Sequence, residues 1–143
     1  MSVPARTERS RYILDSFALL AYLGGEAGEG RVKAVLADAE RGSAEAFLSI
    51  INYGETIYIV EREQGLNAAR KAIAAVDQLP ITVLPADREL TFAAAHIKTH
   101  HPISYADAFA VAVAQKTGAT ILTGDPEFRN VEHLTHIEWL PSS

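Results

Sequence analysis

The chain has 143 residues, 48% hydrophobic and 22% charged, which is long enough for one domain with a sizeable core. The absence of cysteine excludes disulfides, thiolate zinc sites and cysteine nucleophiles, and the net charge of -5 argues against a broad basic surface for nucleic acid. The sequence shows neither a secretory apolar segment nor a membrane span, so we expect a cytoplasmic protein with no membrane association.

The first half of the chain alternates between short apolar runs and helical patterns. Residues 1–10 show neither, and we expect them to be a loose extension of a single domain at 11–143. The elements expected next are a strand at 11–14, helices at 16–23 and 29–41, a strand at 46–49, and helices at 51–64 and 67–78. Glycine ends several of these helices, as at Gly42 and Gly65.

The second half continues the alternation. It predicts a strand at 81–84, helices at 87–98 and 104–117, a strand at 120–122 and a fifth strand at 137–140. Asp87 is a suitable N-cap, and Gly118 ends the last helix. Strands that alternate with helices favour an α/β fold: a three-layer parallel sheet of four to five strands flanked by helices.

Four acidic residues lie in segments that are otherwise apolar. They are Asp15 in YILDSF, Glu55 in NYGETIY, Asp107 in SYADAFAVAVA and Asp125 in ILTGDPEF. An unpaired carboxylate is costly to bury, so such a group normally stays neutral or lies near a cation. A cluster of them would be suited to a divalent metal ion.

The predicted topology places two of these acids together. Asp15 and Asp125 follow the first and fourth strands, and ligands of open parallel sheets bind beyond the carboxyl ends of the strands. Asp107 lies on a helix that is apolar all round, so we expect it to be buried.

Glu55 needs a different argument. It shares a helix row with Ile51, Tyr58 and Ile59, and we expect this row to face inward.

Local capping is the alternative explanation for three of the acids. Asp15 and Asp125 could cap the helices that follow them, and Ser104 with Asp107 resembles a capping box. Capping does not account for Glu55, which lies inside its helix. Nor does it explain why three caps should gather at one edge of the sheet.

Four segments in this order carry a resemblance that extends over nearly the whole chain: YILDSFALLAYL, LSIINYGETIYI, ISYADAFAVAVA and TILTGDPEFRNVE. Together they resemble the PIN-domain family, and specifically the VapC-like toxins of bacterial and archaeal toxin–antitoxin pairs. The resemblance implies a PIN fold, a Mg²⁺ or Mn²⁺ site, endoribonuclease activity, a homodimer and inhibition by a small cognate antitoxin.

The resemblance also assigns the site position by position. The family's acids fall on Asp15, Glu55, Asp107 and Asp125. Secondary positions fall on Ser16, Thr123 and Glu127, although a first-turn glutamate such as Glu127 could equally interact with a helix dipole.

The metal would be held by oxygen ligands. We expect Asp15 and Asp107 to bind it directly, and Glu55 and Asp125 to bind it directly or through water. One ion and two ions are both compatible with this set.

The substrate implied by the resemblance is RNA. Contacts with its phosphates would come from basic residues, for which the sequence offers Arg6, Arg9, Arg11, Lys98 and Arg129.

Other functions remain open from the sequence. A structure-specific DNA nuclease could use the same acids, and a PIN-like module could bind a partner without catalysis. His96 and His100 have an i,i+4 spacing compatible with zinc, but the glutamate of an HExxH motif is missing. Phosphotransfer of the DxD type is disfavoured, because Phe17 stands where the second aspartate would be.

Overall fold

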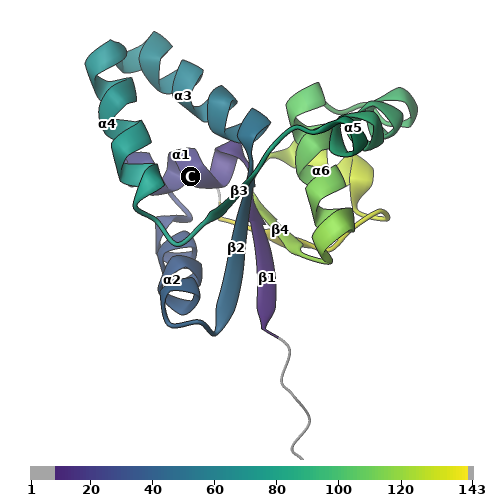
Figure 1. The fold of residues 1–143 in the computed structure, drawn as a ribbon, viewed down its shortest axis with the longest axis horizontal. Coiled ribbons are helices and arrows are strands. Elements are labelled where there is room, and N and C mark those ends of the chain that lie inside the picture. Colours follow the sequence, from purple (N-terminus) through teal and green to yellow (C-terminus); the bar gives the residue numbers. More distant parts are fainter. Residues whose placement is uncertain (1–8, 142–143) are drawn as a thin grey trace, which may run out of the picture.

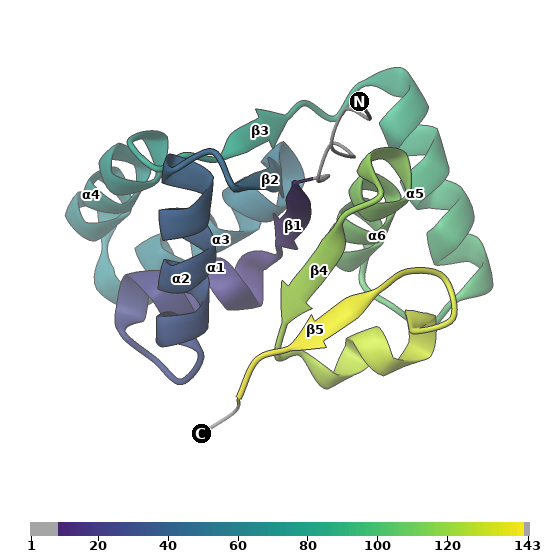
Figure 2. The ribbon, with the colours of Figure 1, turned by 90° about the horizontal axis from the view of Figure 1, so that it is seen from below.

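The computed structural model describes residues 9–141, and within them five parallel strands form one sheet. The strands are β1 (Ser10–Leu14), β2 (Ala44–Ser49), β3 (Thr82–Leu84), β4 (Thr120–Thr123) and β5 (Ile137–Trp139). Their order is β3-β2-β1-β4-β5, with β1 in the centre and every neighbouring pair parallel. In Figure 2, β4 and β5 lie on one side of β1. The strands β2 and β3 lie on its other side.

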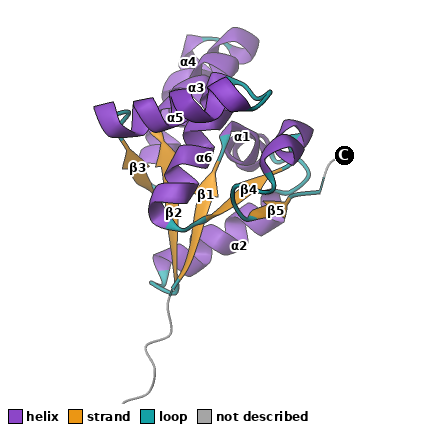
Figure 3. Cartoon of the chain, turned by 90° about the vertical axis from the view of Figure 1, so that its right-hand side faces the viewer, coloured by secondary structure: helices purple, strands orange, loops and turns teal. Residues whose placement is uncertain are grey.

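Helices cover both faces of the sheet. They are α1 (Ser16–Gly24), α2 (Glu29–Glu40), α3 (Ile50–Gln64), α4 (Leu66–Asp77), α5 (Arg88–His100), α6 (Tyr105–Thr117) and the 3₁₀ helix η1 (Pro126–Val131). In Figure 1, α1 to α4 lie on one side of the strands, and α5 and α6 lie on the other. Figure 3 shows the strands in orange and the helices around them in purple.

Alternation along the strands produces two cores. Ile13 and Ile121 point toward α5, α6 and η1, whereas the next residues in the chain, Leu14 and Leu122, pack with α1 and α2. Burial on both faces explains why these strands are nearly continuous apolar runs. The fold is therefore the expected three-layer α/β arrangement.

Side chains and glycines set the helix ends. The caps are Asp15 for α1, Ser49 for α3, Asp87 for α5, Ser104 for α6 and Asp125 for η1, and each accepts a hydrogen bond from a backbone N–H in the first turn. Gly118 ends α6 with a φ of 71°, a left-handed conformation that favours glycine.

The predicted boundaries are close to those observed. The main differences are that β1 begins at Ser10, inside the segment predicted to be loose, and that β4 continues to Thr123. Ser10 pairs with Ala44 of β2, which explains its extended conformation. The rest of the predicted extension, 1–8, lies outside the described residues.

No helix within residues 9–141 combines the length and the apolar character that crossing a membrane requires.

Candidate functional site

The site lies where the strand order reverses. Asp15 directly follows β1, and Asp125 lies two residues beyond the end of β4. These strands are neighbours, with Leu14 in register with Leu122. The two acids therefore share the carboxyl edge of the sheet, at the switch point where ligands of such folds bind.

Asp15 is held tightly at this edge. Its side chain is 1% exposed and accepts hydrogen bonds from the Ala18 amide, at 2.8 Å, and from the Thr123 hydroxyl. Burial raises the pKa of Asp15 to about 7 despite these two bonds, and the charges of Asp125 and Glu55 raise it further. Burial therefore favours the protonated form of this carboxyl.

Asp107 reaches the same place from the first turn of α6. It is 4% exposed, and Asp107 through Ala114 form an uninterrupted buried stretch, as the apolar pattern predicts. Burial raises the pKa of Asp107 to about 8, and the charges of Asp15, Asp125 and Glu127 contribute to the increase. Asp107 therefore lies near the acids that follow β1 and β4 and near Glu127 of η1.

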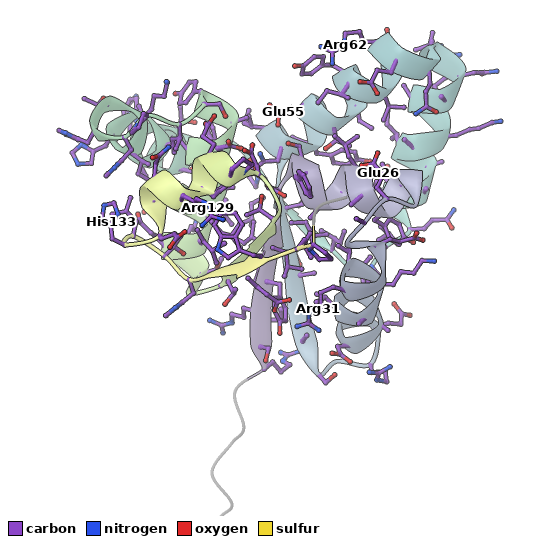
Figure 4. The ribbon with its side chains drawn as sticks, turned by 180° about the vertical axis from the view of Figure 1, so that it is seen from behind. Glu26, Arg31, Glu55, Arg62, Arg129 and His133 are labelled. Atoms are coloured by element: carbon purple, nitrogen blue, oxygen red, sulfur yellow. The ribbon has the colours of Figure 1, made fainter. Side chains whose placement is uncertain are left out.

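Glu55 joins the site from α3. Its carboxylate accepts a hydrogen bond from the Ser16 hydroxyl at the start of α1, so the secondary residue Ser16 does take part. The prediction that the whole helix row faces inward is wrong, because Tyr58 is 55% exposed. The buried residues of α3 are instead Asn52, Tyr53, Thr56 and Val60, and Glu55 is half-buried at the border of that face. In Figure 4, Glu55 lies near the centre of the molecule, and Arg62 lies at the far end of α3.

Thr123, Asp125 and Glu127 form a hydrogen-bonded chain around the end of β4. The Thr123 hydroxyl donates to Asp15 and accepts from the Asp125 amide at 3.0 Å. The Glu127 amide donates to the Asp125 carboxylate at 2.9 Å, and the Glu127 carboxylate accepts from the Ser104 amide. Glu127 therefore connects η1 to the start of α6. An interaction with the dipole of its own helix, the alternative suggested by the sequence, would not include this contact.

The acids take part in helix caps and also converge on one edge of the sheet. Asp15 and Asp125 each accept a hydrogen bond in the following first turn, and the Ser104 hydroxyl accepts one from the Asp107 amide. The same residues converge on one edge together with Glu55. The capping bonds fix the backbone from which the carboxylates project.

The donor set suits a hard divalent cation. Its side chains are carboxylates and hydroxyls, and oxygen is the ligand type that Mg²⁺ and Mn²⁺ prefer. None of the ion pairs within residues 9–141 involves these acids, so the described protein groups leave their charge uncompensated.

The acids are nevertheless not arranged as a coordination shell. In the described part of the chain, no three His, Asp or Glu side chains stand in a metal-holding arrangement. Several of their carboxylate oxygens instead accept hydrogen bonds from Ala18, Thr123, Ser16 and Ser104. Binding a cation would require these side chains to turn toward it.

The histidines form separate contacts. The His96 and His100 rings are 4.7 Å apart on the exposed side of α5, and His101 lies 5.2 Å from His133. Figure 4 places His133 at the outer edge of the molecule, away from Glu55. The i,i+4 pair thus has no third ligand among the described residues that would support a zinc site.

Two of the arginines that the sequence offers for phosphate contacts lie away from the acids. Arg9 and Arg11 stand at the amino end of β1, opposite the acids, and both pair with Glu45 at 3.3 and 3.6 Å. Arg6 lies outside the described residues. Arg129, in η1, packs over the Trp139 ring at 4.9 Å.

Gly124 is a constraint that sequence reasoning missed. It lies between Thr123 and Asp125, and a Cβ atom there would stand 2.3 Å from the Phe17 ring. Phe17 follows Asp15 and Ser16 in the chain, so the close approach packs the loop after β4 onto the start of α1. The glycine in TGD was the available signal.

We expect Gly124→Ala to lower stability by about 1–3 kcal/mol, because the added methyl group must displace the Phe17 ring. Urea unfolding would measure the change. Combining it with Phe17→Leu should recover part of the loss, and equal losses in both backgrounds would contradict the steric explanation.

Asn52 is a second residue that was missed. It is fully buried on α3, one turn before Glu55, and its side-chain oxygen has no hydrogen-bond partner in the described part of the chain. The sequence does show a polar residue three positions before Glu55.

The sequence profile of the PIN domain matches residues 12–134 of the chain. No curated protein sequence matches it significantly.

Solved structures share the fold at low sequence identity. The VapBC2 structure from Rickettsia felis, bound to a DNA fragment from their promoter, has a TM-score of 0.73 at 14% identity, covering 92% of this chain and 99% of that chain. VapC20 of Mycobacterium tuberculosis, described as a sarcin–ricin loop cleaving toxin, has a TM-score of 0.68 at 24% identity, covering 84% and 94%. VapBC-5 of M. tuberculosis, from the VapBC family of toxin–antitoxin systems, has a TM-score of 0.61 at 15% identity, covering 90% and 96%.

Proposed function

Because this chain belongs to the PIN-domain family, we propose that it is a metal-dependent endoribonuclease and the toxin of a toxin–antitoxin pair. One observation carries the enzymatic part of the proposal. Acids that follow β1 and β4 converge with acids of α3 and α6 at the switch point of the sheet, and burial together with the neighbouring charges raises the pKa of Asp15 and Asp107. Evolution of a stable fold alone would favour neutral side chains in such a position.

The residues have distinct roles in this proposal. Asp15 and Asp107, the most buried of the acids, would hold the cation directly, and Glu55 and Asp125 would bind it directly or through water. A divalent cation supplies an activated water as nucleophile and offsets charge developing on the phosphate. Thr123 orients Asp15, and Ser16 orients Glu55, through the hydrogen bonds described above. No side-chain nucleophile takes part.

RNA is proposed as the substrate because of the fold relatives. VapC20, which resembles this chain over most of its length, is described as cleaving the sarcin–ricin loop. Carboxylates and a metal recognise phosphate and do not by themselves distinguish RNA from DNA, which differ at the 2′-hydroxyl. A DNA nuclease therefore remains the competing outcome of the test.

The test compares labelled single-stranded RNA with DNA of the same sequence. We expect cleavage of the RNA in Mg²⁺ or Mn²⁺, no cleavage in EDTA, and recovery when excess Mg²⁺ is restored. RNA cleavage that continues unchanged in EDTA would overturn the metal mechanism. Cleavage of DNA in preference to RNA would overturn the substrate assignment.

Protein partners are proposed from the same comparisons and from the surface. VapBC-5 belongs to a toxin–antitoxin family, which supports a small antitoxin for this chain. Exposed apolar side chains on α3 and α4 include Ile50, Tyr58, Leu66 and Ile73. Apolar surface of this kind is common where proteins associate, which supports both an antitoxin and a homodimer.

A further inference from the structure

Asn52 connects the two helices that carry Glu55 and Asp107. Its side chain is 0% exposed, and its Nδ2 group donates a 3.1 Å hydrogen bond to the backbone carbonyl of Ala106. Ala106 immediately precedes Asp107 in the first turn of α6. Asn52 itself lies three residues before Glu55, on the buried face of α3. One side chain thus links the backbones that carry two acids of the site.

The orientation of the Asn52 amide is determined by its partner. A carbonyl can only accept, so the NH₂ group must face Ala106, and the Oδ1 atom must point away from it. That oxygen is buried without a hydrogen-bond partner among the described residues. Because an unsatisfied buried acceptor destabilises a fold, leucine of similar size would serve packing better than asparagine. Packing alone therefore does not explain an amide at this position.

We propose that Asn52 is a positioning residue that sets the Asp107 carboxylate relative to Glu55. The expected effect on catalysis rests on the proposed metal-dependent function. The hydrogen bond from Asn52 to Ala106 does not depend on that function and can be tested without metal or RNA.

Two contacts hold the start of α6 against the elements that carry the other acids. The Ser104 amide donates to Glu127 of η1, and the Ala106 carbonyl accepts from Asn52 of α3. The first turn of a helix is its least constrained part, because its backbone N–H groups have no partners within the helix. The Ser104 cap lies at the same turn, but among the side-chain hydrogen bonds of residues 9–141 only that of Asn52 joins this turn to the helix of Glu55.

Thr56 provides a matched control on the same helix. It is also fully buried, but its hydroxyl donates to the Asn52 carbonyl at 2.9 Å, within α3. Thr56→Val thus removes a buried hydrogen bond of α3 without breaking the contact with α6.

The first experiment measures amide hydrogen exchange without metal or RNA. In Asn52→Leu we expect exchange in the first turn of α6, at Asp107 and Ala108, to rise about 10-fold relative to the C-terminal half of α6. Thr56→Val should leave this ratio unchanged. If Asn52→Leu does not fold, Asn52→Ser replaces it, since its side chain is too short to reach Ala106. An unchanged ratio in the folded Asn52 variant would overturn the link.

The second experiment measures Mn²⁺ binding by calorimetry and the kinetics of RNA cleavage. We expect about 10- to 100-fold weaker Mn²⁺ binding in Asn52→Leu, a range typical of residues that orient metal ligands, with kcat lowered and KM for RNA unchanged. Thr56→Val should bind Mn²⁺ and cleave RNA as the parent does. Equal Mn²⁺ affinity in Asn52→Leu and Thr56→Val would overturn the positioning role. If the parent protein neither binds Mn²⁺ nor cleaves RNA, the proposed function is wrong. The hydrogen-exchange experiment would still decide whether Asn52 holds the start of α6.

Discussion

Asp107→Asn should lower metal-dependent RNA cleavage by at least about 100-fold and at the same time stabilise the metal-free protein. The loss corresponds to roughly 2.7 kcal/mol of transition-state stabilisation, the scale of one removed electrostatic group. The gain arises because asparagine is neutral, whereas the Asp107 carboxyl is held with its pKa raised to about 8 by burial and neighbouring acids. We expect an increase of about 1–3 kcal/mol in the free energy of unfolding at pH 8 in EDTA.

Asp87→Asn is the matched control for this experiment. Asp87 caps α5 through a 2.8 Å bond from the Leu90 amide, and asparagine can retain such a cap. This variant should keep full cleavage activity and nearly the parental stability. A destabilised Asp107→Asn protein with normal cleavage would mean that Asp107 serves only the start of α6.

The stability of the metal-free parent should fall as the pH rises from about 4 to about 8. Asp15 and Asp107 have pKa values of about 7 and 8 in the folded chain, above the ordinary value of 3.8. In this window the folded state binds more protons than the unfolded state, so their contribution to stability is full below about pH 4 and is lost through pH 7 to 8. Urea unfolding in EDTA at four pH values would measure the slope.

Mg²⁺ should reverse this trend above pH 7, because a cation binds the ionised carboxylates and not their protonated forms. Asp107→Asn should flatten the slope measured in EDTA. A parent whose stability rises through the same window, with no response to Mg²⁺, would contradict the assignment of these two groups as uncompensated buried acids.

Much of the fold followed from local patterns. Apolar runs separated by helical periods predict parallel strands, and the order of Asp15 after one strand and Asp125 after another predicts that they share an edge. The burial of Asp107 followed from the absence of any polar face on α6. These predictions succeeded because burial on both faces of a parallel sheet leaves a strong signal in the sequence.

Features that depend on contacts between distant segments were not predictable in this way. The orientation of α3 is set by packing against α1, α4 and α6, which turns Tyr58 outward although its helix row carries Glu55. The contact of Asn52 with Ala106 joins residues 54 positions apart. The close approach of Gly124 to Phe17 similarly joins the loop after β4 to the start of α1, which meet only in the folded chain.

A crystal structure of the protein grown with Mn²⁺ would test the proposed metal site most directly, because anomalous scattering locates manganese without reference to activity. We predict an anomalous peak at the carboxyl ends of β1 and β4, in contact with both Asp15 and Asp107, and no such peak in Asp107→Asn. A peak bound instead by the histidines of α5, or no peak in crystals of a protein that cleaves RNA, would contradict it.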